Sequence, residues 1–298
     1  MWCTKAHEVL KDLPIRDVVS WSALISGYAQ QGLGHEALKC FEQMQSEGLS
    51  PNVVTLICTL KACGSIGAIE KGKQIHEDIV GRCLLEKDTV IGNALVDMYV
   101  KCGLMVKSRE VFCELPVKNI EAWNSLIMGY AQLGQSNVVL DLFQKMRAEC
   151  IVPDSITFLV LLTSCTHAGL FEEGEKLFDD MCFVFSFNPE LEHCTCMIDL
   201  FCRAGHFDKA KVLLEKVKVL LNNKEPSHNN LPLFLAILGA CRKWGNVDLG
   251  RWAFEQCLQL DRTCAAAYVF MGNIYIAADM HGEADRINCL RVSNEEII

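Results

Sequence analysis

Cysteine is the residue with the most chemical potential in this sequence, because seventeen of its 298 residues are cysteines. Zinc sites usually take cysteine pairs two to four residues apart, repeated later in the chain. No Cys-x-x-Cys pair occurs here, and the closest two cysteines are Cys194 and Cys196. Others stand inside apolar runs, as Cys63 and Cys241 do after an alanine. The pattern favours cysteine as a small buried residue in a reducing compartment, and it predicts no metal site.

A second candidate for chemistry is the run His281-Gly282-Glu283, which matches the first half of a zinc-deaminase motif. That motif continues with Pro-Cys-x-x-Cys, which completes the zinc site. Only Cys289 follows in this sequence, so we interpret the match as a chance one. We therefore expect no catalytic residues, no stoichiometric zinc, no other cofactor and no deamination by the purified chain.

The remaining residues are organised by an internal repeat. Residues 21–32 and 123–134 are identical at eight of twelve positions, at an offset of 102 residues. The same offset relates Phe41 to Phe143 and Gly103 to Gly205. Because chance does not keep one offset over such a distance, the chain is a repeat protein.

The 102-residue unit divides into three segments that each contain two helical patterns. In residues 18–52, for example, Leu24, Ile25 and Tyr28 form one apolar face, and a second face follows after Gly32 and Gly34. The complete division is a partial repeat at 1–17, then 18–52, 53–88 and 89–119, a second round at 120–154, 155–190 and 191–221, a polar loop from Leu220 to Asn230, and two further helix pairs at 231–264 and 265–298.

Short helix pairs of this kind cannot bury their apolar faces alone, whereas stacked pairs can. The sequence therefore predicts an all-α, right-handed α-solenoid superhelix of antiparallel helix pairs with a concave groove and no sheet. Ser20, Thr55 and Thr157 precede the first helices and suit the N-cap, where a hydroxyl accepts an amide hydrogen bond.

Composition excludes some classes of function. The net charge is −9, which argues against a nonspecific nucleic-acid binder, although a neutral or locally basic groove is compatible with it. The mean hydropathy is +0.19, yet no apolar run reaches 18 residues, so we expect no membrane span.

These patterns resemble the plant pentatricopeptide repeat family, in its P-L-S subclass. The segment lengths of 35, 36 and 31 residues are typical of that subclass, and the runs at 92–103 and 123–130 are close to its consensus. Under this resemblance residues 18–52 and 120–154 are P repeats, 53–88 and 155–190 are L repeats, and 89–119 and 191–221 are S repeats. Residues 231–264 and 265–298 are similar to the family's E1 and E2 motifs, although Asp279 and His281 depart from the second of them.

The resemblance implies that single-stranded RNA is bound at one nucleotide per repeat. In the family, a base is read by the fifth residue of the first helix and the last residue of the repeat. The pairs here are Ser22 with Asn52, Asn93 with Asn119, and Asn124 with Asp154, with Thr195 at the fifth place of the second S repeat. The family's code assigns adenine, a pyrimidine and uracil to the three pairs.

The resemblance also implies contacts with base faces and phosphates, for which the residue types give less support. Val19 and Val90, at the second place of their repeats, either pack on bases or belong to the core, whereas Glu121 and Glu192 depart from that pattern. Lys101 and Arg203 lie 102 residues apart and either meet phosphates or are exposed helix-end cations. Ile57 and Leu159, at the fifth place of the L repeats, cannot hydrogen-bond a base edge.

The resemblance leads to the prediction of a specificity factor for C-to-U RNA editing in an organelle, with the deaminase supplied by a partner protein that docks on residues 231–298. The organelle is a mitochondrion or a chloroplast, with the mitochondrion preferred. The alternatives are a non-editing RNA factor for splicing, stability or translation, a peptide-binding scaffold of the tetratricopeptide type, an enzyme, and an inactive truncated product. Since residues 5–17 match the end of a repeat, we expect an incomplete amino end or a lost leader.

Overall fold

Helix pairs make up the described structure. The computed structural model describes residue 10, residues 16–222 and residues 231–295, and it contains helices and no β-strand within these ranges. The all-helical fold that the periodicity predicts is therefore confirmed. The chain divides into two compact units, residues 1–154 and residues 155–298, and each is described by itself.

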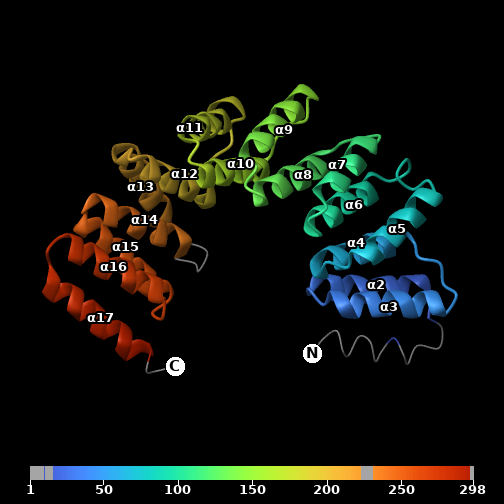
Figure 1. Cartoon of the computed structure of the whole chain (residues 1–298), viewed down its shortest axis with the longest axis horizontal. Helices are drawn as coiled ribbons and strands as arrows, with labels where there is room; N and C mark the ends of the chain where they lie inside the picture. Colours follow the sequence, from blue (N-terminus) through green and yellow to red (C-terminus); the bar gives the residue numbers. More distant parts are fainter. Residues whose placement is uncertain (1–9, 11–15, 223–230, 296–298) are drawn as a thin grey trace. The chain divides into compact units, whose positions relative to one another are not determined.

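Residues 16–154, the continuous described part of the first unit, form four helix pairs. They are α2 (Val18–Gln30) with α3 (Gly34–Ser46), α4 (Val53–Ile66) with α5 (Ile69–Gly81), α6 (Thr89–Lys101) with α7 (Met105–Glu114), and α8 (Ile120–Gln132) with α9 (Ser136–Ala148). Each first helix packs against the first helix of the next pair, and the intervening second helix contacts both (Figure 1). Trp21 and Trp123, which the repeat relates, are 1% and 2% exposed in this core.

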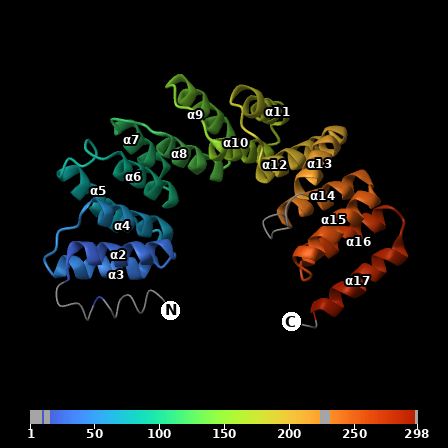
Figure 2. The ribbon, with the colours of Figure 1, turned by 180° about the vertical axis from the view of Figure 1, so that it is seen from behind.

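The second unit repeats the arrangement. Its pairs are α10 (Ser155–Ala168) with α11 (Phe171–Asp179), α12 (Leu191–Ala204) with α13 (Phe207–Asn222), α14 (Leu231–Trp244) with α15 (Val247–Leu260), and α16 (Ala265–Ala277) with α17 (His281–Glu295). A π-helical turn, η1 (Asp180–Val184), extends α11, and the succession of pairs is seen from behind in Figure 2.

The polar loop that the sequence predicts from Leu220 begins later than expected. Helix α13 continues to Asn222, because Leu220 and Leu221 prolong a run of good helix formers. The remainder of that predicted loop, residues 223–230, lies outside the described residues. Most of the predicted partial repeat at 1–17 also lies outside them.

The predicted helix caps were wrong by three residues. Helix α2 is capped by Asp17, whose carboxylate accepts a 2.9 Å hydrogen bond from the amide of Ser20, and α4 is capped by Asn52. Ser20, Thr55 and Thr157 are instead the third residues of α2, α4 and α10. Carboxylate and amide oxygens reach the amide three residues on, and Ser20 completes a capping box by accepting from the amide of Asp17 at 3.0 Å.

Glycine closes the turn between the two helices of a pair. Gly32 has a φ of +72°, a conformation that residues with a side chain rarely adopt. Gly34, which the sequence suggests as a second breaker, is instead the first residue of α3. A Cβ atom there would lie 2.6 Å from Ile66 Cγ2, so close helix packing explains this glycine.

A cavity of about 690 Å³ in the first unit is lined by α5, α6 and α7. His76 on its wall is 9% exposed, and its Nδ1 lies 2.9 Å from the Tyr99 hydroxyl. The His76 Nε2 atom is buried without a hydrogen-bond partner among the described residues. Burial, and to a smaller extent the nearby Lys107 charge, lower the pKa of His76, so the folded protein holds it neutral.

The first unit should therefore lose stability as the pH falls below about 6.5, where His76 binds a proton in the unfolded chain but resists it in the folded one. The double variant H76F/Y99F introduces the pair that the repeat places in the second unit, Phe178 and Phe201. Its midpoint of unfolding, followed by circular dichroism from pH 7.5 to 5, should depend less on pH than that of the wild type. Equal pH dependence in the two proteins would contradict this account of His76.

Candidate nucleic-acid interface

Ser22 and Asn52 are brought together by the start of α4. Ser22 lies in α2 and is 5% exposed, whereas Asn52 is exposed and caps α4. The Asn52 Oδ1 atom accepts hydrogen bonds from the amide of Thr55 at 2.8 Å and from its hydroxyl at 2.9 Å. The Thr55 hydroxyl also lies 2.6 Å from the Ser22 hydroxyl. Arg82 fixes the segment before the cap by donating to the Pro51 carbonyl at 2.9 Å.

Asn93 and Asn119 are held in a different way. Asn119 caps α8, where its Oδ1 accepts from the amide of Ala122 at 3.1 Å. Ala122 carries no hydroxyl, so nothing equivalent to Thr55 links the two asparagines. The Asn93 Oδ1 atom is buried without a hydrogen-bond partner among the described residues. This acceptor of the predicted reading residue therefore forms no hydrogen bond within the described structure.

Asn124 and Asp154 contact each other directly. The Asn124 Nδ2 atom donates to both carboxylate oxygens of Asp154, at 3.1 and 3.3 Å. Both side chains are half-buried. The carboxylate thus fixes the orientation of the amide before any ligand arrives.

The fifth residue of α12, Thr195, turns its hydroxyl inward. It donates to the Leu191 carbonyl at 2.7 Å, one turn back along the helix. Ile57 and Leu159, the apolar residues at the fifth place of α4 and α10, are half-buried.

Apolar side chains at the second place of the first helices are exposed. Val19 is 70% exposed and Val90 is 54% exposed, which argues against the core reading of these two residues. Val54 and Ile156, which were not predicted from the sequence, hold the same place in α4 and α10 and are 56% and 57% exposed. Their β-branched types, one residue into each helix, are the signal that would have found them. Glu121 and Glu192 occupy that place in α8 and α12 and are exposed as well.

Lys101 and Arg203 are exposed, but each is paired with an acid on its own helix. Lys101 Nζ lies 2.8 Å from Asp97, and an Arg203 guanidinium nitrogen lies 2.9 Å from Asp199. The hydrogen bond and charge of Asp199 raise the pKa of Arg203. A phosphate at either place would compete with this carboxylate, which weakens each cation as a phosphate ligand.

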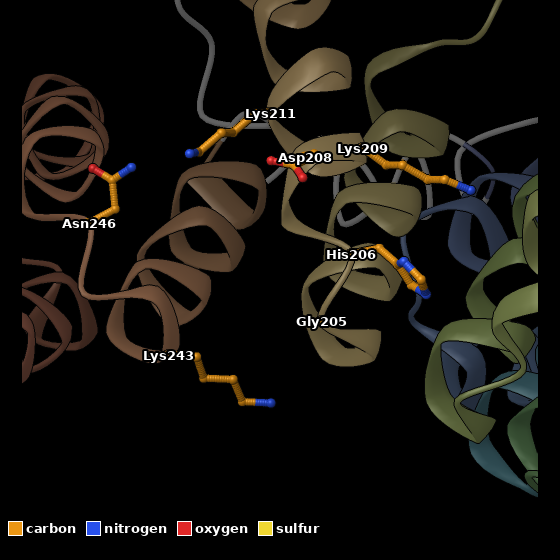
Figure 3. A pocket seen from close by; sticks show the side chains of 7 residues that line it. All are labelled: Gly205, His206, Asp208, Lys209, Lys211, Lys243 and Asn246. Carbon is orange, nitrogen blue, oxygen red and sulfur yellow. The ribbon is translucent and has the colours of Figure 1, made fainter.

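A basic pocket of about 590 Å³ lies in the second unit between the α12–α13 turn and the α14–α15 turn (Figure 3). It is lined by Gly205, His206, Asp208, Lys209, Lys211, Lys243 and Asn246. Lys209 pairs with Glu175, whereas neither Lys211 nor Lys243 forms an ion pair with another described residue. Lys243 stands two residues before its turn glycine, as Lys101 and Arg203 do. That spacing is the sequence signal by which it could have been found.

The thiols do not form a metal site in the described residues, where no three side chains of the metal-binding types gather. Half of the described cysteines are buried, and burial raises the pKa of thiols such as Cys63 and Cys241 to about 12. Glu283 pairs with Arg286 at 3.0 Å, and His281 is exposed. The absence of zinc and of deaminase activity stays a prediction. No helix in the described ranges combines the length and apolarity that crossing a bilayer requires.

Family models match most of the helix pairs. A model described as "PPR repeat family" matches residues 16–65 and 118–167, and one described as "PPR repeat" matches residues 93–120, 156–182 and 192–220. Together these ranges cover more than half of the chain. This chain belongs to the pentatricopeptide repeat family.

Curated pentatricopeptide repeat relatives from Arabidopsis thaliana align along almost the whole chain. The putative protein At3g28640 is 36% identical over 95% of this chain and 55% of its own length. CRR2, named as chloroplastic, is 37% identical over 96% of this chain and 42% of its own length. At3g13770, a putative protein named as mitochondrial, is 34% identical over 96% of this chain and 44% of its own length. The chain therefore spans about half, or less, of the length of these relatives.

The solved structure of the pentatricopeptide repeat protein PPR10, in complex with an 18-nucleotide psaJ RNA element, is similar to this chain at a TM-score of 0.78. The match covers 98% of this chain and 43% of PPR10, at 16% identity. At that identity the likeness concerns the fold, and it confirms the predicted helical solenoid.

Proposed function

We propose that this chain is a sequence-specific, single-stranded RNA-binding protein of a plant organelle, of the P-L-S subclass, and that it specifies sites of C-to-U editing. The observation that carries the proposal is the construction of the three polar pairs in the first unit. Each pair combines the fifth residue of one first helix with the residue just before the next first helix, so three of the four described helix pairs of the first unit carry a possible reading position.

The Asn124–Asp154 pair supports recognition of uracil. Uracil presents a ring N–H beside a carbonyl on its Watson–Crick edge. The Asp154 carboxylate is an acceptor and the Asn124 amide carries donor hydrogens, so the pair holds both kinds of group that this edge requires. Asp154 can accept the ring N–H while Asn124 donates to the carbonyl.

Apolar contacts to the faces of the bases complete the proposed interface. Val19, Val54 and Val90 of the first unit are exposed and one residue into their helices. A branched apolar side chain there gives a base a surface to pack on without reading its identity. Glu121 offers no such surface in α8.

The family's register then predicts the target sequence. With P-L-S repeats parallel to the RNA, the second S repeat faces about the fourth nucleotide before the edited cytidine. The Asn124–Asp154 pair then faces about −6, Asn93–Asn119 about −7 and Ser22–Asn52 about −9. The expected site has adenine at −9, a pyrimidine at −7 and uracil at −6.

The salt dependence of binding should be shallow. The net charge is −9, and Lys101 and Arg203 are held by acids on their own helices. Release of about two to four counterions predicts a log–log slope between about −1.4 and −2.8 for single-stranded RNA. Lys243→Ala should make the slope shallower by about 0.7, and Lys101→Ala should change it less. A wild-type slope steeper than about −5, measured by fluorescence anisotropy, would show that more cations meet the RNA.

The two carboxy-terminal helix pairs are the proposed docking site for a deaminase-bearing partner. Residues 231–298 contain α14 to α17, and Ile276, Leu290 and Val292 are about half exposed there. The names of the relatives CRR2 and At3g13770 support an organellar location.

The proposal is tested first by selection from a random RNA library with the full chain. We expect enrichment of adenine, any base, a pyrimidine and uracil at four successive positions. Plants that lack the gene should then show unedited cytidines downstream of such a site when their organellar transcripts are sequenced.

Two outcomes would oppose parts of the proposal. Enrichment of no motif would argue against base reading by this chain. Altered splicing or transcript abundance with editing unchanged would favour the non-editing RNA factor.

A further inference from the structure

Thr55 connects the two residues of the Ser22–Asn52 pair from a position that the pairwise reading code does not include. Its side chain is fully buried at the third place of α4. Its hydroxyl lies 2.6 Å from the Ser22 hydroxyl and 2.9 Å from Asn52 Oδ1. The Ser22 hydroxyl also lies 2.6 Å from the Val18 carbonyl. The three contacts form one hydrogen-bonded chain of Val18, Ser22, Thr55 and Asn52.

The chain has three links but only two hydroxyl protons to fill them, one on Ser22 and one on Thr55. In one arrangement Ser22 donates to Thr55, and Thr55 donates to Asn52. In a second, Ser22 donates to the Val18 carbonyl, and Thr55 donates to Ser22. In a third, Ser22 donates to Val18 and Thr55 donates to Asn52, which leaves the contact between the two hydroxyls without a proton. All three arrangements direct the Ser22 proton into the protein, so Ser22 offers only a lone pair to a ligand.

Asn52 is oriented in the opposite sense. Its Oδ1 is engaged by the amide and the hydroxyl of Thr55, at 2.8 and 2.9 Å. This leaves the Nδ2 donors of the exposed amide for a ligand. The pair therefore presents one acceptor, from Ser22, beside one donor, from Asn52.

Adenine and cytosine carry an exocyclic amine beside an unprotonated ring nitrogen, which complements this order of groups. Guanine, like the O4–N3 side of uracil, carries a carbonyl beside a ring N–H, and these edges would place acceptor against acceptor and donor against donor. To bind them, Ser22 would have to turn its proton outward and give up an internal hydrogen bond, which costs free energy at a buried site.

We infer that Thr55 is a specificity-determining positioning residue, which holds Ser22 as an acceptor and Asn52 as a donor so that this repeat takes adenine and rejects guanine. The inference rests on the proposed function and deepens it. The neighbouring Asn93–Asn119 pair provides the internal contrast. Ala122 stands where Thr55 stands, nothing links the two asparagines, and the predicted preference there is for either pyrimidine.

The test is a binding series with the full chain and four short single-stranded RNAs. They carry uracil at −6, a pyrimidine at −7, and each of the four bases in turn at −9. The wild type should bind the adenine RNA about tenfold more tightly than the guanine RNA. Thr55→Val removes the hydroxyl and should reduce that ratio to about twofold or less. Thr55→Ser keeps the hydroxyl and should retain most of the ratio.

Thr59→Val is the matched control. Thr59 is also fully buried in α4, one turn further on, but its hydroxyl donates only to the Thr55 carbonyl, at 2.7 Å. Thr59→Val should leave the ratio of the affinities for the adenine and guanine RNAs unchanged. Thermal melts of all variants report on folding. Thr55→Ala also removes the hydroxyl, introduces less steric bulk and should lower the ratio in the same way. If one of the two variants fails to fold, the other still tests the role of Thr55.

The results distinguish a failure of base reading by the Ser22–Asn52 pair from a failure of the role of Thr55. A wild type that does not distinguish bases at −9 overturns the reading role of the pair and the role of Thr55 with it. A wild type that prefers adenine, together with folded Thr55→Val and Thr55→Ala variants that keep the same ratio, overturns the role of Thr55 alone. A Thr55→Ser variant that behaves like Thr55→Val would also overturn it.

Discussion

Asn124→Thr is expected to move the preferred base at −6 from uracil to guanine. Both bases present a carbonyl beside a ring N–H, so Asp154 can accept the ring proton of either. The hydroxyl of threonine can still donate to the carbonyl, and its shorter side chain leaves more room for a purine. Thr with Asp is also the family's guanine pair. The loss of the matched uracil contact should cost about 1–3 kcal/mol in a binding series on RNAs varied at −6.

Asn93→Thr is the control for this exchange, because it makes the same change in the preceding repeat. It should leave the preference at −6 in place and alter the one at −7. Binding of all four bases at −6 with equal affinity by the wild type would show that the register, or the reading role of Asn124, is wrong. A uracil preference that survives in Asn124→Thr would do the same.

Trp123→Ala is expected to destabilise the first unit by about 3–5 kcal/mol. Trp123 is 2% exposed in α8 and packs edge-to-face on Phe112, with ring centroids 4.7 Å apart. Its indole nitrogen has no hydrogen-bond partner among the described residues, so the cost is one of packing and of the cavity left behind. Urea unfolding followed by circular dichroism gives the measurement.

Met128→Ala, on an exposed part of the same helix, is the matched control and should change the free energy of unfolding by less than about 0.5 kcal/mol. If both variants unfold at the same urea concentration, the packing of Trp123 does not stabilise the core as its burial indicates.

The fold of residues 18–221 was predictable from sequence because the repeat gives each of three helix pairs twice. Trp21 and Trp123 identify equivalent helices, and Gly32 and Gly134 identify equivalent turns. The caps were not predictable in this way, because a hydroxyl and an amide three residues apart both suit a helix start. Only the backbone shows that Asn52 is the cap and Thr55 is its hydrogen-bond partner.

The positions of the reading pairs also followed from the sequence, through the resemblance, and their function stays a proposal. Their hydrogen bonds did not follow, since Ser22 and Thr55 belong to different repeats and meet only when α2 packs against α4. The pairing of Lys101 with Asp97 could have been foreseen. An acid four residues before a base on a helix is a common ion pair, and the repeat preserves it as Asp199 and Arg203.

The order of helix contacts has a consequence for how this protein forms. In the described residues, every substantial contact between helices joins members of one pair or of successive pairs. Contacts so close in sequence require little loop closure, and chains with such contacts fold in about microseconds to milliseconds. Structure can begin at any pair and propagate to its neighbours. Because the ribosome adds only about 5–20 residues per second, each pair has time to consolidate on the preceding one before the next has been synthesised.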